Sequence, residues 1–258
     1  MEIDKMTMVT TKEEFKEYLL EFISTYKADI PKLVELEVSL RDEKNAFNEY
    51  PSTPKTPNLT AIRSTGEKAF QRGIINGKYS FLDYKNGNNE KVTWLDLELP
   101  VVLNQNPRRC CLDLLGSLDG ISLLCELKFF EKTPSDHPIY GIVELLMYRY
   151  FIQCNYEKLD KYRVYHSIIS NDFKWEDIVK DNSPILILAA NKKYWEYWLK
   201  KLGANRLLKL LLDLNKRLGT NLHLFETSDE DFLTQKGNQV AYCPKVTNQQ
   251  WIKVIHHF

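Results

Sequence analysis

The sequence lacks the marks of several large classes of protein. Its 258 residues contain no apolar run close to the ~20 residues that a membrane-spanning helix needs. Residues 1–11 contain no apolar stretch of the kind that signal peptides carry. The chain also has no glycine-rich phosphate-binding loop and no Ser/His/Asp pattern that indicates a catalytic triad. We therefore expect a cytoplasmic protein that makes no membrane contact and carries neither of these two kinds of site.

Cysteine is scarce, and an excess of charge is absent. The five cysteines are odd in number and show no Cys-x-x-Cys spacing, which argues against a zinc site and favours a reducing compartment. Lysine plus arginine and aspartate plus glutamate both total 35, so the net charge gives no long-range attraction to nucleic acid. A nucleic-acid-binding protein of this composition would need a local basic surface.

The most informative segment is a β-hairpin predicted within residues 109–130. Asp119-Gly120 stands between two apolar runs, a pattern typical of a two-residue hairpin turn. With that turn, Leu118 faces Ile121, and every residue further out is paired by counting from these two. A three-residue turn with a bulge would change the pairing, because a slip of one residue moves each side chain to the other face.

The predicted register places Asp113 directly opposite Glu126, with Lys128 two residues further along the same face. Two opposed carboxylates repel each other, so a positive group is expected between them. A divalent cation suits this position, because hard cations bind carboxylate oxygens. A structural ion pair at a sheet edge would explain the same residues, and the geometry alone leaves both readings open.

These residues resemble the active-site motif of a known family. Asp113, then twelve residues, then Glu126-Leu127-Lys128 is similar to the motif of the PD-(D/E)XK nuclease superfamily, although Leu112 stands where proline is common. The resemblance covers residues 63–190. It implies an α/β protein with a restriction-endonuclease-like core, a mixed β-sheet flanked by helices. It also implies that Asp113 and Glu126 hold Mg²⁺ (or Mn²⁺) while Lys128 orients the attacking water.

The pattern along the chain predicts two regions. Residues 1–60 read as a helical N-terminal extension, and residues 61–258 read as the nuclease-like α/β domain. Periodicity and turn residues predict helices over 11–26, 31–47, 64–75, 138–154, 192–202 and 205–218, and strands over 79–84, 94–103, 162–169, 184–190 and 222–226, besides the two strands of the hairpin. Residues 203–258 read as an elaboration of the core.

Three further residues could support the site. The resemblance implies that Glu67, in the helix before the strands, joins the metal site, but Ser64 and Glu67 also have the spacing of a helix capping box. Glu144 and Tyr148 stand one turn apart on the helix that follows the hairpin, away from its apolar stripe. Related enzymes often carry a glutamine near here that positions the lysine. A solvated helix face would account equally well for Glu144 and Tyr148.

Two basic clusters are candidates for contact with phosphates. Their residues are Lys158, Lys161 and Arg163 in one cluster and Lys192 and Lys193 in the other. In the second cluster Lys200 and Lys201 follow about two turns later, with Tyr194, Trp195 and Trp198 interleaved, as in surfaces that stack bases. The alternative is a solvated helix face whose aromatic side chains point into the core.

The sequence thus predicts a metal-dependent nuclease that hydrolyses phosphodiester bonds in nucleic acid, with DNA favoured over RNA. Asp113, Glu126 and Lys128 are the predicted catalytic residues. The first alternative is a nuclease-fold protein that binds nucleic acid or a protein partner without cutting it. The second is an interaction protein with a chance Glu-x-Lys. The oligomeric state is left open, with a dimer among the options.

Overall fold

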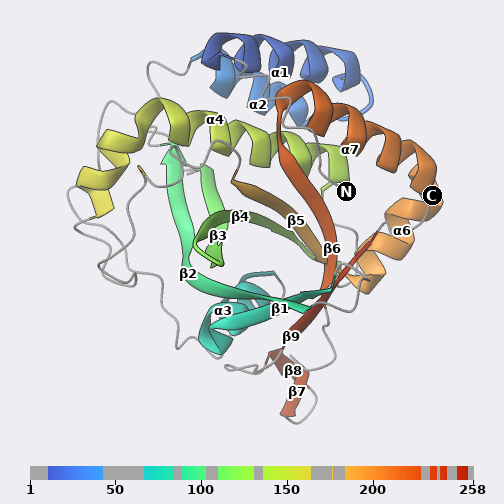
Figure 1. Ribbon diagram of the computed structural model, residues 1–258. Helices are drawn as coiled ribbons and strands as arrows, with labels where there is room; N and C mark the ends of the chain where they lie inside the picture. The colour runs from blue at the N-terminus through green and yellow to red at the C-terminus, as the bar shows by residue number, and fades with distance from the viewer. Residues whose placement is uncertain are drawn as a thin grey trace, which may run out of the picture.

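A computed structural model describes residues 11–42, 67–83, 89–102, 110–130, 136–163, 176, 184–227, 233–236, 239–242 and 249–254 (Figure 1). The helices are α1 (Lys12–Tyr26), α2 (Leu33–Arg41), α3 (Glu67–Gly77), α4 (Pro138–Arg163), α6 (Lys192–Leu202) and α7 (Ala204–Leu218), and the strands are β1 (Tyr79–Asp83), β2 (Asn89–Val102), β3 (Cys110–Leu118), β4 (Ile121–Lys128), β5 (Ile185–Asn191), β6 (Asn221–Thr227), β7 (Leu233–Lys236), β8 (Gln239–Tyr242) and β9 (Gln249–Lys253). No helix among the described residues is long and apolar enough to cross a membrane.

Seven of the strands form a closed barrel in the order β1-β2-β3-β4-β5-β6-β9. The prediction of an open, restriction-endonuclease-like mixed sheet is therefore wrong. The difference lies in β9, which pairs in parallel with β1 and antiparallel with β6 and so joins the two edges of the sheet. The strand directions are mixed, because β4, β5 and β6 run parallel while β1 to β4 are antiparallel. Strands β7 and β8 form a separate two-stranded sheet.

Helices cover the outside of the barrel. The outward-facing side chains of the strands share one apolar core with α1, α2, α4, α6 and α7, and the side chains that point into the barrel pack with α3 in a second core. Figure 1 shows α1 and α2 lying on the far side of α4 from the strands. Leu19 and Ile23 of α1 are fully buried, and the Phe15 ring stacks on Tyr150 of α4 at 6.2 Å between ring centroids. The N-terminal helices therefore belong to the main core.

The predicted hairpin is confirmed in its turn and its register. Strands β3 and β4 pair antiparallel with Leu118 opposite Ile121. Asp119 and Gly120 form the turn with φ angles of 49° and 84°. Positive φ at both central residues is the condition for the hairpin turn that matches strand twist, and Asp-Gly meets it at low cost. The described pairing continues to Leu114 and Cys125, one position before Asp113 and Glu126.

The neighbouring strand β2 is irregular at the position that matters for the site. Leu97 pairs with Leu114 and Leu99 with Leu112, so Glu98, which has a φ of 49°, stands across from Asp113. Before Glu98, the pair Leu97 and Leu114 belongs to the core inside the barrel. After it, the pair Leu99 and Leu112 belongs to the core outside the barrel. A left-handed residue within a strand turns the chain that follows it, which explains the change of face.

The same strand corrects a prediction about Asp96. The alternation of residues 94–99 favours a solvated face for Asp96, but its side chain is fully buried. The register shifts between Trp94 and Asp96, so a bulge places Asp96 opposite Leu115, whose side chain lies in the core outside the barrel. Its Oδ1 accepts a hydrogen bond of 2.7 Å from the N–H of Leu97.

Helix α4 is longer than predicted. It runs to Arg163, with a non-helical residue at Asn155 (φ −135°, ψ 16°) that divides it. The expected end at residue 154 thus coincides with a break in the helix. The expected strand over 162–169 begins inside α4, and its remaining residues lie outside the described part of the chain.

Candidate active site

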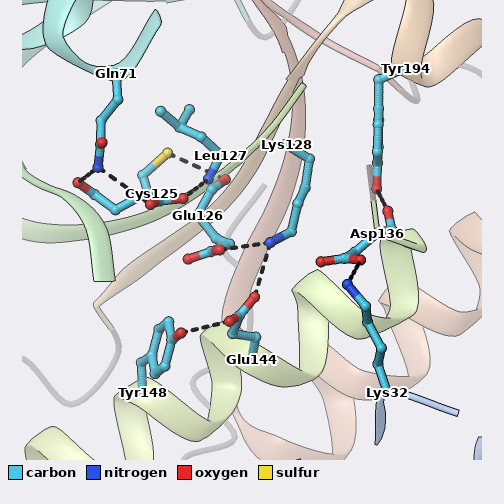
Figure 2. Close-up of polar contacts among 11 residues, drawn as sticks. Lys32, Gln71, Cys125, Glu126, Leu127, Lys128, Asp136, Glu144, Tyr148 and Tyr194 are labelled. Carbon is cyan, nitrogen blue, oxygen red and sulfur yellow. Dashed lines mark hydrogen bonds and ion pairs between the residues drawn. The ribbon is translucent and has the colours of Figure 1, made fainter. Parts of the chain in front are cut away.

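The site is built around Lys128, the last residue of β4. Its ammonium Nζ lies 2.8 Å from Oε1 of Glu126 and 3.0 Å from Oε2 of Glu144, and it is placed between these two carboxylates (Figure 2). Lys128 and Glu126 are only 5% and 4% exposed. Both point to the outer face of the barrel, because alternate residues of a strand share a face, and α4 covers that face. A buried charge of this kind requires a partner, and each of the two supplies it for the other.

Glu144 and Tyr148 hold the lysine from α4. They are four residues apart, so they lie on the same side of the helix. The hydroxyl of Tyr148 donates to Oε1 of Glu144 at 2.7 Å, while Oε2 of Glu144 binds Lys128. The structure therefore brings both predicted supporting residues to the site. The solvated-face alternative does not fit Tyr148, whose side chain is 1% exposed.

Gly141 makes room for Lys128 at the start of α4. A Cβ atom at this position would lie 2.9 Å from Cδ1 of Leu188 and 3.1 Å from Cε of Lys128. Contacts this short require the neighbouring side chains to move. The close approach of α4 to the end of β4 thus depends on the absence of a side chain at residue 141.

Asp113 is held at the point where the β3–β4 pairing ends. Its Oδ2 accepts a hydrogen bond of 2.8 Å from the N–H of Leu127. Gln71 of α3 donates through Nε2 to the carbonyl oxygen of Asp113 at 2.6 Å and to Oδ1 at 3.3 Å. Sequence reasoning missed Gln71, although it stands four residues after Glu67 and therefore on the same side of its helix.

Glu67 is the first residue of α3 and contributes to the same cluster. Burial raises the pKa of Glu67, as do Glu144 and Asp136, whereas Lys128 and an N–H of Phe129 lower it. These influences place Glu67 among the carboxylates around Lys128. Ser64, the capping partner in the alternative reading, lies outside the described residues.

Buried carboxyl groups outnumber buried cations in this cluster. Burial raises the pKa of Asp113 to about 7, with a further increase from Glu67 and a decrease from Lys128. Burial and then the charge of Asp113 raise the pKa of Glu126 well above its ordinary value. Burial lowers the pKa of Lys128, but Glu126, Glu144, Asp113 and Glu67 together raise it by more, so Lys128 stays protonated. The ammonium of Lys128 therefore interacts with four carboxyl groups, those of Glu126, Glu144, Asp113 and Glu67.

The oxygen atoms of this cluster fit a hard divalent cation. Oε2 of Glu126 is buried and has no hydrogen-bond partner among the described residues. A cation would bind such an oxygen and offset the excess of negative charge. Among the described residues no group of three His, Cys, Asp or Glu side chains is arranged around a common metal position. Mg²⁺ does not require one, since it commonly uses one or two carboxylates and keeps several waters.

No protein-family model matches this chain, and neither a curated protein nor a solved structure matches it. The chemistry of the site is therefore derived from its own geometry. The residues brought together are Asp113, Glu126, Lys128, Glu67, Glu144 and Tyr148, with Gln71 added by the structure.

The predicted basic residues belong to two helices, α4 and α6. Lys192 and Lys193 are exposed at the beginning of α6. Lys158, Lys161 and Arg163 belong to the last part of α4, and their side chains lie outside the described part of the structure.

Asn191, which sequence reasoning also missed, fixes the chain just beyond Lys128. Its Oδ1 accepts from the N–H of Phe130 and its Nδ2 donates to the carbonyl of Phe130, both at 3.0 Å. The signal in the sequence that could have identified Asn191 is its polar side chain at the end of the apolar strand β5.

Proposed function

We propose that this protein is a metal-dependent nuclease that hydrolyses phosphodiester bonds in nucleic acid, with DNA as the first substrate to test. One observation carries the proposal: the ammonium of Lys128 binds the carboxylates of Glu126 and Glu144 and interacts electrostatically with Asp113 and Glu67, and one buried oxygen of Glu126 has no partner among the described residues. The resemblance of Asp113 and Glu126-Leu127-Lys128 to the PD-(D/E)XK motif supports the same proposal.

Each residue has a distinct role in the proposed reaction. Asp113 and Glu126 hold Mg²⁺ or Mn²⁺, with Glu67 as a further ligand. When bound, such an ion would lower the pKa of a water molecule and neutralise phosphate charge. Lys128 donates hydrogen bonds to the attacking water and to the charge that develops on the phosphate. Glu144 and Tyr148 hold Lys128 in place while it does so.

The test is cleavage of single- and double-stranded DNA and RNA with Mg²⁺ or Mn²⁺, together with calorimetric titration of the metal. Glu126→Gln should abolish cleavage and weaken metal binding, because it removes one charged ligand and keeps the shape of the side chain. Lys128→Met should abolish cleavage but retain metal binding, because an ammonium cannot bind a cation. The matched control is Glu17→Gln on the exposed side of α1, which should change neither.

A second candidate is a protein that binds nucleic acid without cutting it. The finding that favours it is the lack, among the described residues, of a ready trio of metal ligands. Calorimetry separates the two candidates. Heat of Mg²⁺ binding that is lost in Glu126→Gln supports the nuclease, and nucleic-acid binding with no metal binding at all supports the second candidate.

A further inference from the structure

A row of partly exposed aromatic rings begins where the catalytic face of β4 ends. Glu126, Lys128 and Phe130 are alternate residues, so they share one face, each ~7 Å from the next. The Phe130 ring lies 5.7 Å from the ring of Tyr197 on α6, between centroids. Asn191 holds the backbone of Phe130 through two hydrogen bonds, so the point from which this ring projects is fixed relative to Lys128.

The row continues along α6 to the start of α4. The Tyr197 ring meets the Trp198 ring edge to face at 5.1 Å, and the Trp198 ring lies 4.5 Å from the ring of His137. All four rings, those of Phe130, Tyr197, Trp198 and His137, are partly exposed. By contrast, Tyr194 and Trp195 of the same helix are almost fully buried, so α6 uses some of its aromatic residues for the core and leaves others at the surface.

The surroundings of these rings are positively charged. Helix α6 carries four lysines and one glutamate, and the lysines are all exposed. Lys201 Nζ lies 4.3 Å from the centre of the Tyr197 ring and 5.5 Å from that of Trp198. Burial, followed by the charge of Arg206, lowers the pKa of His137 to about 4, so this ring is neutral at neutral pH. Neutral rings beside lysines on a protein of zero net charge are complementary to bases joined by phosphates.

We propose that Phe130, Tyr197, Trp198 and His137 form a stacking platform for unpaired bases of a single-stranded nucleic acid. The proposal rests on the nuclease function, and it names the class of substrate: a strand whose bases are free to stack beside the phosphate held at Lys128. A base can stack on an aromatic ring only when it is not paired within a duplex, so the platform selects single strands or unpaired ends.

The test is binding of a short single-stranded oligodeoxynucleotide that carries 2-aminopurine, whose fluorescence falls when it stacks. Chelator keeps metal-dependent cleavage out of the measurement, and the salt concentration is fixed because phosphate contacts depend on it. Tyr197→Leu should weaken single-strand binding by about 5- to 100-fold, the range measured for one stacked base. The matched control, Tyr197→Phe, keeps the ring and should bind as the wild type does.

Three results would overturn the platform: no single-strand binding by the wild type, equal binding by Tyr197→Leu, or an equal loss of affinity for the matching duplex. Cleavage assays with Mg²⁺ on the same proteins keep the two proposals separate. If the wild type cleaves duplex but Tyr197→Leu binds single strands normally, the platform fails and the nuclease stands. If single-strand binding depends on Tyr197 but no metal restores cleavage, the platform stands and the nuclease fails.

Discussion

Lys128 is the residue on which the site depends, because it is the cation that acts on Glu67, Asp113 and Glu126 alike. In the absence of a metal ion it neutralises only part of the surrounding charge. At the scale of single residues, therefore, the stability of the folded protein should change when positive charge is added beside these carboxyl groups or removed from residue 128.

Lys128→Met tests the excess of negative charge directly. Removing one partner of a buried ion pair costs about 3–5 kcal/mol, so the free energy of unfolding should fall by that order. Mg²⁺ should then raise the melting temperature of the variant more than that of the wild type, because the carboxylates lose their own cation. The double variant Glu126→Gln with Lys128→Met serves as the control and should respond less. If Mg²⁺ leaves all three melting temperatures unchanged, the carboxylates do not bind it.

Asp113 predicts a dependence of stability on pH. Its pKa is 3.8 in an unfolded chain and about 7 in the folded protein. Between these values the folded protein keeps a proton that the unfolded chain has released, so stability falls as the pH rises from about 4 to about 7. Urea unfolding in chelator should show a smaller fall in Asp113→Asn than in the wild type. Saturating Mg²⁺ should have the same effect as the substitution. A parallel fall in the wild type and the variant would contradict this assignment.

At the scale of elements, the approach of α4 to β4 positions the groups of the candidate site. The helix reaches the strand at Gly141, where Lys128 and Leu188 leave no space for a side chain. The helix also supplies Glu144 and Tyr148 one and two turns later. Small changes in the distance between these two elements should therefore affect catalysis more than stability.

Gly141→Ala is the corresponding test. The added methyl group should cost about 1–3 kcal/mol through crowding and should displace Lys128, so cleavage should fall by much more than the folded fraction does. Adding Leu188→Val removes one of the two crowded contacts. The double variant should regain stability without regaining activity. Recovery of both would show that the position of Lys128 is not critical.

The parts of the site that could be predicted are those that local sequence determines. Asp119-Gly120 specifies the turn, and the turn specifies the register that brings Asp113 towards Glu126 and Lys128. Gln71, Asn191 and the burial of Asp96 could not be predicted in the same way. The first two act on residues of another element, and the third depends on a bulge in β2, so none follows from spacing along the chain.

At the scale of the whole molecule, closure of the barrel was also beyond prediction. Ser80 of β1 pairs with Gln249 of β9, 169 residues away, and the short segment of β9 has no alternation that identifies its neighbours. The two N-terminal helices, predicted as an extension, share the main core with α4. Such packing is decided by which apolar surfaces remain uncovered, and periodicity does not contain that information.

Trp251 tests how far the molecule depends on closure. Its side chain is fully buried within the barrel, 5.1 Å from Trp94 between ring centroids. Trp251→Ala should lower the free energy of unfolding by about 3–5 kcal/mol in urea titrations. The matched control is Ile252→Ala, next to it on the same strand but 42% exposed, which should cost less than about 0.5 kcal/mol. A loss in Trp251→Ala as small as the one expected for Ile252→Ala would mean that β9 contributes little to the fold.

The contrast between the β3–β4 hairpin and the β1–β9 pairing also has a consequence for the order in which the chain folds. The hairpin joins residues that are close in sequence, so its ends meet at little entropic cost and it can form early. The β1–β9 pairing joins residues that are 169 positions apart, so on the ribosome it must wait until β9 has been synthesised. We expect the β3–β4 hairpin to acquire its register first and β9 to close the barrel afterwards. Hydrogen-exchange labelling during refolding would reveal this order as early protection in β3 and β4 and late protection in β1 and β9.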